Sequence, residues 1–144
     1  YRAFTEGTWQ HFRRSETQQC AAVFARERNL VLMFENGGGE EGALLVFIGP
    51  ELAKPDAPRR LRVSLRQNQD AEPQRVEVFS YRVPQTEFGA LAIAVPTIDA
   101  LIANMLDTHL FEISIAGSQV FSLEWHGGNA ARASLAECLS QPRE

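Results

Sequence analysis

The spacing of the apolar residues changes at Ile98, and that change constrains the fold more than any motif does. Before Ile98, apolar side chains occur in short runs or alternate with polar ones. The alternation is clearest from Arg60 to Arg66, which is typical of a β-strand with one buried and one solvated face. From Ile98 to Leu106 the apolar residues recur every three or four positions, which indicates an amphipathic helix. The pattern predicts a mainly β protein with few helices.

Turn-forming glycine, proline and asparagine residues divide the β pattern into strand-length segments. The expected extended segments are Thr8 to Arg26, Leu30 to Phe34, Ala43 to Ile48, Arg60 to Arg66, Arg75 to Val83, Phe88 to Val95, Leu110 to Ile115 and Gln119 to Trp125. Helical spacing predicts two short helices, Thr97 to Asp107 and Asn129 to Leu139, each N-capped by its first residue. About eight strands and two helices favour an antiparallel β-sandwich or curled sheet, with both helices in the C-terminal half.

The length and charge of the chain limit its class. A chain of 144 residues predicts a single domain spanning residues 1–144. The net charge of −4 gives no reason to expect nucleic-acid binding, and no apolar run reaches the ~20 residues of a membrane-spanning helix. The chain begins at Tyr1 rather than methionine, which fits either removal of a secretory signal peptide or a boundary chosen by an experimenter. No cofactor is expected, and the oligomeric state stays open.

Two cysteines stand near opposite ends of the chain, and each lies in an apolar segment. A disulfide between Cys20 and Cys138 would tie the first part of the sheet to the last helix. In the chain-entropy model, closing a loop of about 100 residues stabilises a fold by about 4.7 kcal/mol. Such a bond requires an oxidising compartment, which predicts a periplasmic or secreted protein. The alternative is two separate buried thiols.

Arginine side chains gather on one face of two neighbouring predicted strands. The predicted binding surface consists of Arg60, Arg62, Arg66, Arg75, Arg82 and Tyr81, with Phe79 as a further stacking side chain. Arg82 belongs to this surface only if a β-bulge shifts the alternation, because it shares parity with Val76 and Val78. The surface predicts docking of an acidic protein or a polyanion. The alternative is an ordinary solvated sheet face, partly neutralised by Glu77.

A glycine-rich segment joins the second and third predicted strands. Gly37 to Gly39 lack the lysine and the following helix of a phosphate-binding loop. Glu35, Glu40 and Glu41 lack the ligand spacing of a calcium loop, so we expect a solvated hairpin turn. If this tip protruded, the segment from Glu35 to Gly42 would suit an inhibitor that inserts a loop into another enzyme.

Catalytic and metal-binding motifs are not evident. His11, His109 and His126 are not at metal-ligand spacing, and no Gly-x-Ser-x-Gly nucleophile motif occurs. His126 precedes two glycines, so its ring is expected near a turn and in an exposed or capping role. The sequence therefore predicts no catalytic residue and no metal ligand. A hydrolase with a cleft near His126 is kept as the enzymatic alternative.

The order of a few residues over most of the chain resembles a known family. Trp9 and Cys20 precede the strands, and Phe121 to Leu123 lead through Gly127 and Gly128 towards Cys138. In this order the chain resembles small secreted bacterial proteins of the invasion-associated locus B type. The resemblance implies a disulfide-containing β-sandwich with a short C-terminal helix, carried through the bacterial envelope. It implies no catalytic residues.

Overall fold

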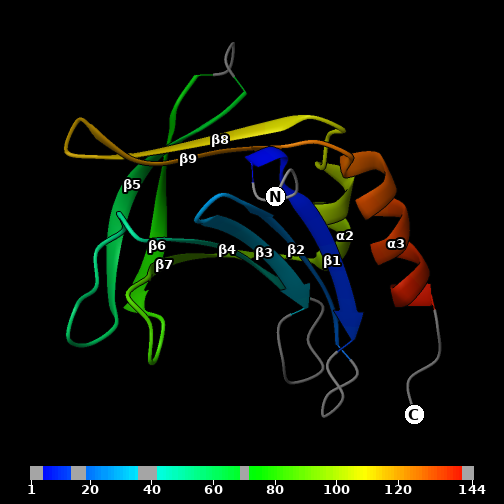
Figure 1. Cartoon of the computed structure of the whole chain (residues 1–144), viewed down its shortest axis with the longest axis horizontal. Coiled ribbons are helices and arrows are strands. Elements are labelled where there is room, and N and C mark those ends of the chain that lie inside the picture. The colour runs from blue at the N-terminus through cyan, green and yellow to red at the C-terminus, as the bar shows by residue number, and fades with distance from the viewer. Residues whose placement is uncertain (1–4, 14–18, 36–41, 69–71, 141–144) are drawn as a thin grey trace.

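The computed structural model describes residues 5–13, 19–35, 42–68 and 72–140, and it confirms a mainly β fold (Figure 1). The strands are β1 Thr8–Arg13, β2 Cys20–Arg26, β3 Asn29–Glu35, β4 Ala43–Gly49, β5 Arg59–Gln67, β6 Gln74–Arg82, β7 Gly89–Val95, β8 His109–Ile115 and β9 Ser118–Trp125. They form one sheet in the order β1-β2-β3-β4-β7-β6-β5-β8-β9. Each neighbouring pair is antiparallel.

The sheet is strongly curled and is not a two-sheet sandwich. In Figure 1, β8 and β9 pass over β1 to β4, and β9 contacts β2 and β3 although it lies at the other edge of the sheet. This curl encloses the core. Phe47 on β4 packs against Phe111 of β8 and Phe121 of β9, with ring centroids 5.2 and 5.4 Å apart. The two sheet options left open by the sequence are thus resolved in favour of the curled sheet.

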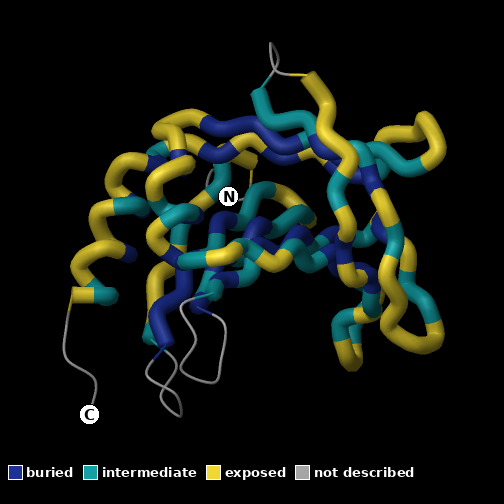
Figure 2. The backbone as a smooth tube through the Cα atoms, turned by 180° about the vertical axis from the view of Figure 1, so that it is seen from behind, coloured by how far each residue is buried: buried dark blue, intermediate teal, exposed yellow. Residues whose placement is uncertain are grey.

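Strict alternation divides most strands into an inner face, directed at this core, and an outer face. Val63 on β5 and Val78 on β6 are both 2% exposed and lie on the inner face. Buried and less buried segments follow one another along the strands in Figure 2. The segment predicted as one strand, Thr8 to Arg26, is two antiparallel strands, and residues 14–18 between them lie outside the described part.

Helix α2, Ile98–Ala103, begins as predicted but is shorter. The Thr97 hydroxyl oxygen accepts the Ala100 N–H at 2.9 Å, which confirms Thr97 as the N-cap. The helix ends at Asn104, whose side-chain amide donates to the Ala100 carbonyl at 2.8 Å. The predicted extension to Asp107 is therefore wrong, and Leu106, which the helical spacing placed on the buried face, is 48% exposed.

Helix α3, Gly128–Ser140, begins one residue before the predicted start and is capped by a different residue. The Asn129 N–H donates to the Asp107 carboxylate at 3.1 Å, so Asp107 rather than Asn129 caps the helix. Gly128 lies so close to the segment between α2 and β8 that a Cβ there would be 2.0 Å from the Leu106 carbonyl oxygen. Ala131 and Leu135 are buried on the predicted face of the helix, with Cys138 and Leu139 half-buried beside them.

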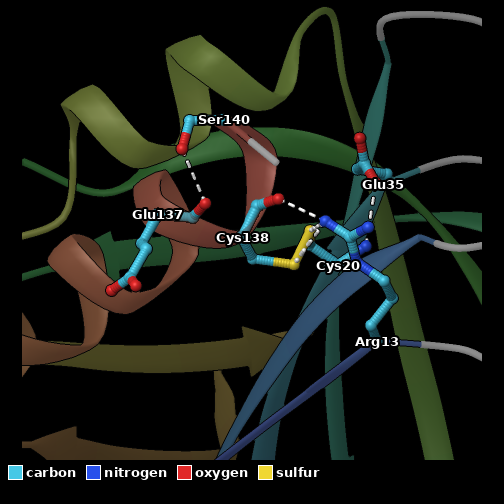
Figure 3. The surroundings of a disulfide bond; sticks show 6 residues. All are labelled: Arg13, Cys20, Glu35, Glu137, Cys138 and Ser140. Carbon is cyan, nitrogen blue, oxygen red and sulfur yellow. Dashed lines mark hydrogen bonds between the residues drawn. A yellow bond between two sulfur atoms is a disulfide. The ribbon is translucent and has the colours of Figure 1, made fainter. Parts of the chain in front are cut away.

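A disulfide joins Cys20 of β2 to Cys138 of α3, across 118 residues of sequence (Figure 3). This is the pairing expected from the sequence. The Arg13 guanidinium lies beside the bond, with Nη2 3.4 Å from Cys138 Sγ, and it donates to the Cys138 carbonyl. Glu35 is buried and accepts the Cys20 N–H at 2.8 Å, so the expectation that it belongs to a solvated turn is wrong. Together these contacts fasten α3 to the first strands of the sheet.

The described part of the chain contains no helix that is long and apolar enough to cross a membrane. The glycine-rich hairpin tip predicted between β3 and β4 lies at residues 36–41, outside the described residues. Its far strand, β4, begins at Ala43 and pairs with β3 in the antiparallel hairpin expected from the sequence. The hairpin from β8 to β9 is also confirmed, and it turns through Ala116 and Gly117, both with positive φ.

Candidate functional site

The register of β5 against β6 places most of the predicted arginine surface on the outer face. Arg60 lies opposite Phe79, Arg62 opposite Glu77, and Ser64 opposite Arg75. Directly paired residues of antiparallel strands point to the same side of the sheet. We call Arg60, Arg62 and Arg75, all exposed, the arginine row.

The arginine row carries uncompensated positive charge. Within the described residues, none of its three guanidinium groups forms an ion pair, even though Glu77 pairs with Arg62 in the register. Three arginines and one glutamate give this patch a net charge of +2, in a protein whose net charge is −4. The sign of the charge on this patch is thus opposite to that of the whole protein.

Arg66 belongs to the same face but is already paired. Its Nε donates to Glu112 Oε1 on the neighbouring strand β8 at 2.8 Å, and Nη2 bonds to the same oxygen. The register also places Arg66 opposite Glu112. The charge of Arg66 is therefore compensated within the sheet, and we do not count it in the arginine row.

Arg82 does not belong to the predicted surface. Strand β6 pairs with β5 and β7 without a bulge, so Arg82 keeps the parity of Val78 and lies opposite Gly89. Its guanidinium donates to the Lys54 carbonyl at 3.2 Å, which holds the loop before β5. Arg82 would have joined the other arginines only if a β-bulge had shifted the alternation, and the pairing of β6 contains no such bulge.

Tyr81 and Phe79 extend the arginine row into an aromatic surface. Tyr81 lies opposite Ala90 and is half-buried on the outer face, where burial raises the pKa of its phenol. The ring therefore stays uncharged at neutral pH and offers an apolar surface with one polar end. Phe79 lies opposite Ala92 and is 44% exposed, so much of its ring is accessible on the outer face.

Beside these aromatics the outer face is hollowed into an open groove of about 440 Å³. Its apolar lining comes from four strands, and its polar edge from Arg60 and Glu77. The apolar lining residues on the outer face are Phe34 on β3, Leu44 and Val46 on β4, Phe79 and Tyr81 on β6, and Ala92 and Ala94 on β7; the inner-face residue Val78 also borders the groove. This volume lies within the range of small-ligand and anchor sites. The groove was not predicted from the sequence.

Small side chains on the middle strand produce the hollow. Strand β7 lies between β4 and β6, and its outer positions are Ala90, Ala92 and Ala94. Leu44 faces Ala94 and Val46 faces Ala92, so larger side chains stand beside an alanine floor. The alternation of alanine with Leu91, Ile93 and Val95 is readable in the sequence. Whether these alanines form the floor of a groove depends on the pairing of β7 with β4 and β6, which the sequence does not reveal.

Strands β3 and β4 carry a second signal of this surface in the sequence. Leu30 to Phe34 and Leu44 to Ile48 are apolar at every position, although only alternate residues face the core. Val31 and Phe47 are fully buried on the inner face, whereas Leu32 and Leu44 are only half-buried on the outer face. Strands that are apolar on both faces are typical of sheets covered on both sides.

The alternative sites have less support. His126 is exposed, as expected, and its Nε2 lies 2.6 Å from the Glu6 carbonyl, while its ring packs edge-on against Phe24. Its hydrogen-bond partner within the described residues is thus a main-chain carbonyl rather than a carboxylate or hydroxyl. The described residues also contain no cluster of three or more His, Cys, Asp or Glu side chains that could hold a metal ion. The loop proposed for an inhibitor lies mostly at residues 36–41, outside the described part.

Comparisons of this chain with protein-family models, curated proteins and solved structures found no match. The functional assignment therefore rests on the geometry of the outer face. That geometry combines arginines without ion-pair partners among the described residues, one exposed and one half-buried aromatic ring, and an open apolar groove, which are features typical of binding surfaces.

Proposed function

We propose that this protein is a non-catalytic binding protein of the bacterial envelope, and that it docks an acidic protein partner on its outer face. One observation carries the proposal: the arginine row, without ion-pair partners among the described residues, borders an open apolar groove. Charge on such a surface directs partner choice and speeds association. Apolar groups that are buried on binding contribute most of the affinity.

A protein partner fits this surface better than a simple polyanion does. A polyanion would engage the arginines but would leave Phe79 and the groove in water. A protein segment offers both carboxylates and apolar side chains, so it uses both parts of the surface. Interfaces are enriched in arginine and aromatic side chains, the two types that meet where Arg60 faces Phe79.

The Cys20–Cys138 disulfide supports a location outside the cytoplasm. We therefore propose that the protein is periplasmic or secreted, as the resemblance to the invasion-associated locus B type also implies. Intact mass measured before and after reduction, on protein produced in an oxidising compartment, checks the bond. We expect alkylation of the cysteines only after reduction. Two thiols that react without reduction would contradict the proposed location.

Binding of a fluorescein-labelled, glutamate-rich peptide, followed by anisotropy at low ionic strength, tests the proposed function. We expect Arg62→Gln to weaken binding about threefold to tenfold, because one uncompensated charge is lost from the arginine row. The matched control is Arg82→Gln, which changes the net charge equally but lies off the row; it should leave the affinity unchanged. If the two variants behave alike, or the unmodified protein does not bind, the proposed function is wrong.

A further inference from the structure

We infer that the partner is recognised through a segment in which an uncharged apolar anchor adjoins a run of alternating acidic residues. The anchor occupies the groove, and the carboxylates lie along the arginine row. This inference rests on the proposed function, since it requires that the outer face binds an acidic protein. It adds the chemistry and the order of the groups that the partner presents.

The groove suits an aromatic or branched aliphatic side chain. The Phe34 and Leu44 side chains line it on one side, and Phe79 and Tyr81 line it on the other. Ala92 between them leaves the space that a larger side chain would have filled. Side chains that fill such apolar pockets are the residues that carry most of the affinity in protein interfaces.

Glu77 makes an acidic anchor unfavourable, and the mostly apolar lining of the groove favours an uncharged one. Its carboxylate is at the edge of the groove, on the same face as Arg60 and Arg62. A second carboxylate placed inside the groove would meet Glu77 in apolar surroundings, where repulsion between like charges is strong. Acidic groups of the partner are therefore expected outside the groove, along the arginine row.

The arginine row continues away from the groove in regular steps. Arg60 lines the groove, Arg62 lies one same-face position further along β5, and Arg75 lies beside Ser64, one further step away. Same-face neighbours of a strand are roughly 6.6 Å apart, so the row extends over about 13 Å. An extended peptide repeats its own side chains at the same spacing. Acidic residues at alternate positions therefore match the row.

Two other occupants are less compatible with these charges. A single fatty-acid carboxylate would compensate one arginine and leave the remaining two unpaired. A second copy of this chain, related by a two-fold axis, would place the same basic patch on both sides of the contact. That arrangement brings like charges together, which is unfavourable.

The test uses two fluorescein-labelled peptides and the full chain. The anchored peptide begins with Trp-Leu and continues with alternating Glu and Ser, and the unanchored peptide replaces Trp-Leu by Ser-Ser. We expect the anchored peptide to bind at least tenfold more tightly, because only it fills the groove. Equal affinities would overturn the inference but leave the proposed function standing. If neither peptide binds, the proposed function itself fails.

Two variants locate the anchor. Ala94→Phe adds a ring at an exposed position of the groove and should remove the advantage of the anchored peptide. Phe79→Ser deletes an exposed wall of the groove and should reduce the same advantage, so the test does not depend on one variant folding. Ala133→Phe adds the same ring at an exposed position of α3 and is the matched control. An advantage that survives both groove variants would place the anchor elsewhere and overturn the inference.

The same samples test the two other possible occupants of the groove, a fatty acid and a second copy of this chain. Dodecanoate that displaces the anchored peptide at equal concentration would show that the groove takes an acyl chain instead. Sedimentation of the peptide-free protein as a dimer that Ala94→Phe dissociates would show that a second copy covers the groove. We expect a monomer, and either of the other results would overturn the inference.

Discussion

Two hairpins of the same sheet use their outer faces differently. The β3–β4 hairpin is apolar on both faces, whereas the β5–β6 hairpin alternates between an apolar inner face and an arginine-bearing outer face. Both hairpins contribute to one core, as Phe47 and Val63 are each at most 2% exposed. The two hairpins therefore differ on the outer face, whose side chains contribute little to the stability of the fold.

The two hairpins meet at β7, and the proposed site lies where they meet. Ala92 faces Val46 of the apolar hairpin on one side and Phe79 of the alternating hairpin on the other. The groove thus has one wall from each hairpin, and the charge comes from only one of them. A partner that binds there has to match an apolar surface and a basic surface at the same time.

The largest expected effect separates the two faces of the apolar hairpin. Phe47→Ala removes a fully buried ring from the inner face and should destabilise the protein by about 3–5 kcal/mol. Leu44→Ala removes a half-buried outer side chain and should cost about 1 kcal/mol or less. Urea unfolding of both variants measures the difference. Equal losses would mean that β4 is covered on both sides in the isolated protein.

The next largest effect is a pH dependence of stability that comes from His109, which lies on the inner face beside the end of β5. Gln67 Oε1 lies 2.9 Å from His109 Nε2, and the buried His109 ring accepts the Leu106 N–H at Nδ1. Burial lowers the pKa of His109 from 6.5 to about 4. The folded protein therefore resists protonation that the unfolded chain accepts, and stability falls as the pH drops from about 6.5 towards 4.

The expected loss from this histidine is on the order of 3 kcal/mol across that pH window. Urea unfolding at pH 7 and pH 4.5 measures it, and His109→Gln should remove most of the dependence. His126→Gln, at an exposed position, is the matched control and should retain the dependence. A profile that His109→Gln leaves unchanged would assign the titration to another group.

A smaller effect tests the inner face of the alternating hairpin. Val63 is 2% exposed and lies opposite Val76 on β6. Val63→Ala should destabilise the protein by about 1–3 kcal/mol, because two buried methyl groups are lost. A thermal melt like that of the parent protein would invert the assignment of inner and outer faces.

The smallest effects compare two arginines on the outer face of β5. Arg62→Ala should change stability by less than about 0.5 kcal/mol, since its guanidinium has no ion-pair partner among the described residues. Arg66→Ala should cost about 1 kcal/mol, because it leaves the half-buried Glu112 without its partner. Urea unfolding of both single variants measures the difference. A greater loss for Arg62→Ala would mean that its side chain is part of the core packing.

Local sequence patterns predicted most of the helices and strands. They also predicted the arginine row of the candidate site, but not its groove. Alternation placed Arg60, Arg62 and Arg75 on one face, and the capping chemistry of Thr97 placed the start of α2. These features depend on residues close together in sequence. Because no bulge interrupts the pairing of β6, the alternation also predicts the face of the sheet on which Arg82 lies.

Features that depend on distant pairing could not be predicted in the same way. The groove exists because β4 and β6 lie on either side of β7, in a strand order where β4 pairs with β7 and not with β5, the next strand in the chain. Asp107 caps α3 from the other side of a hairpin, and Glu35 is buried because it meets the Cys20 N–H. None of these contacts leaves a periodic signal, since each joins segments that are far apart in the chain.

The most direct test of the central claim is chemical-shift mapping by NMR of the isotope-labelled protein with the anchored acidic peptide. We expect the perturbed methyl signals to be those of Leu44, Val46 and Ala92, with amide changes along β5 and β6. Signals of the inner face, such as the Val63 methyl groups, should hardly move. Perturbations that cluster instead around His126 or around the Cys20–Cys138 disulfide would contradict the account.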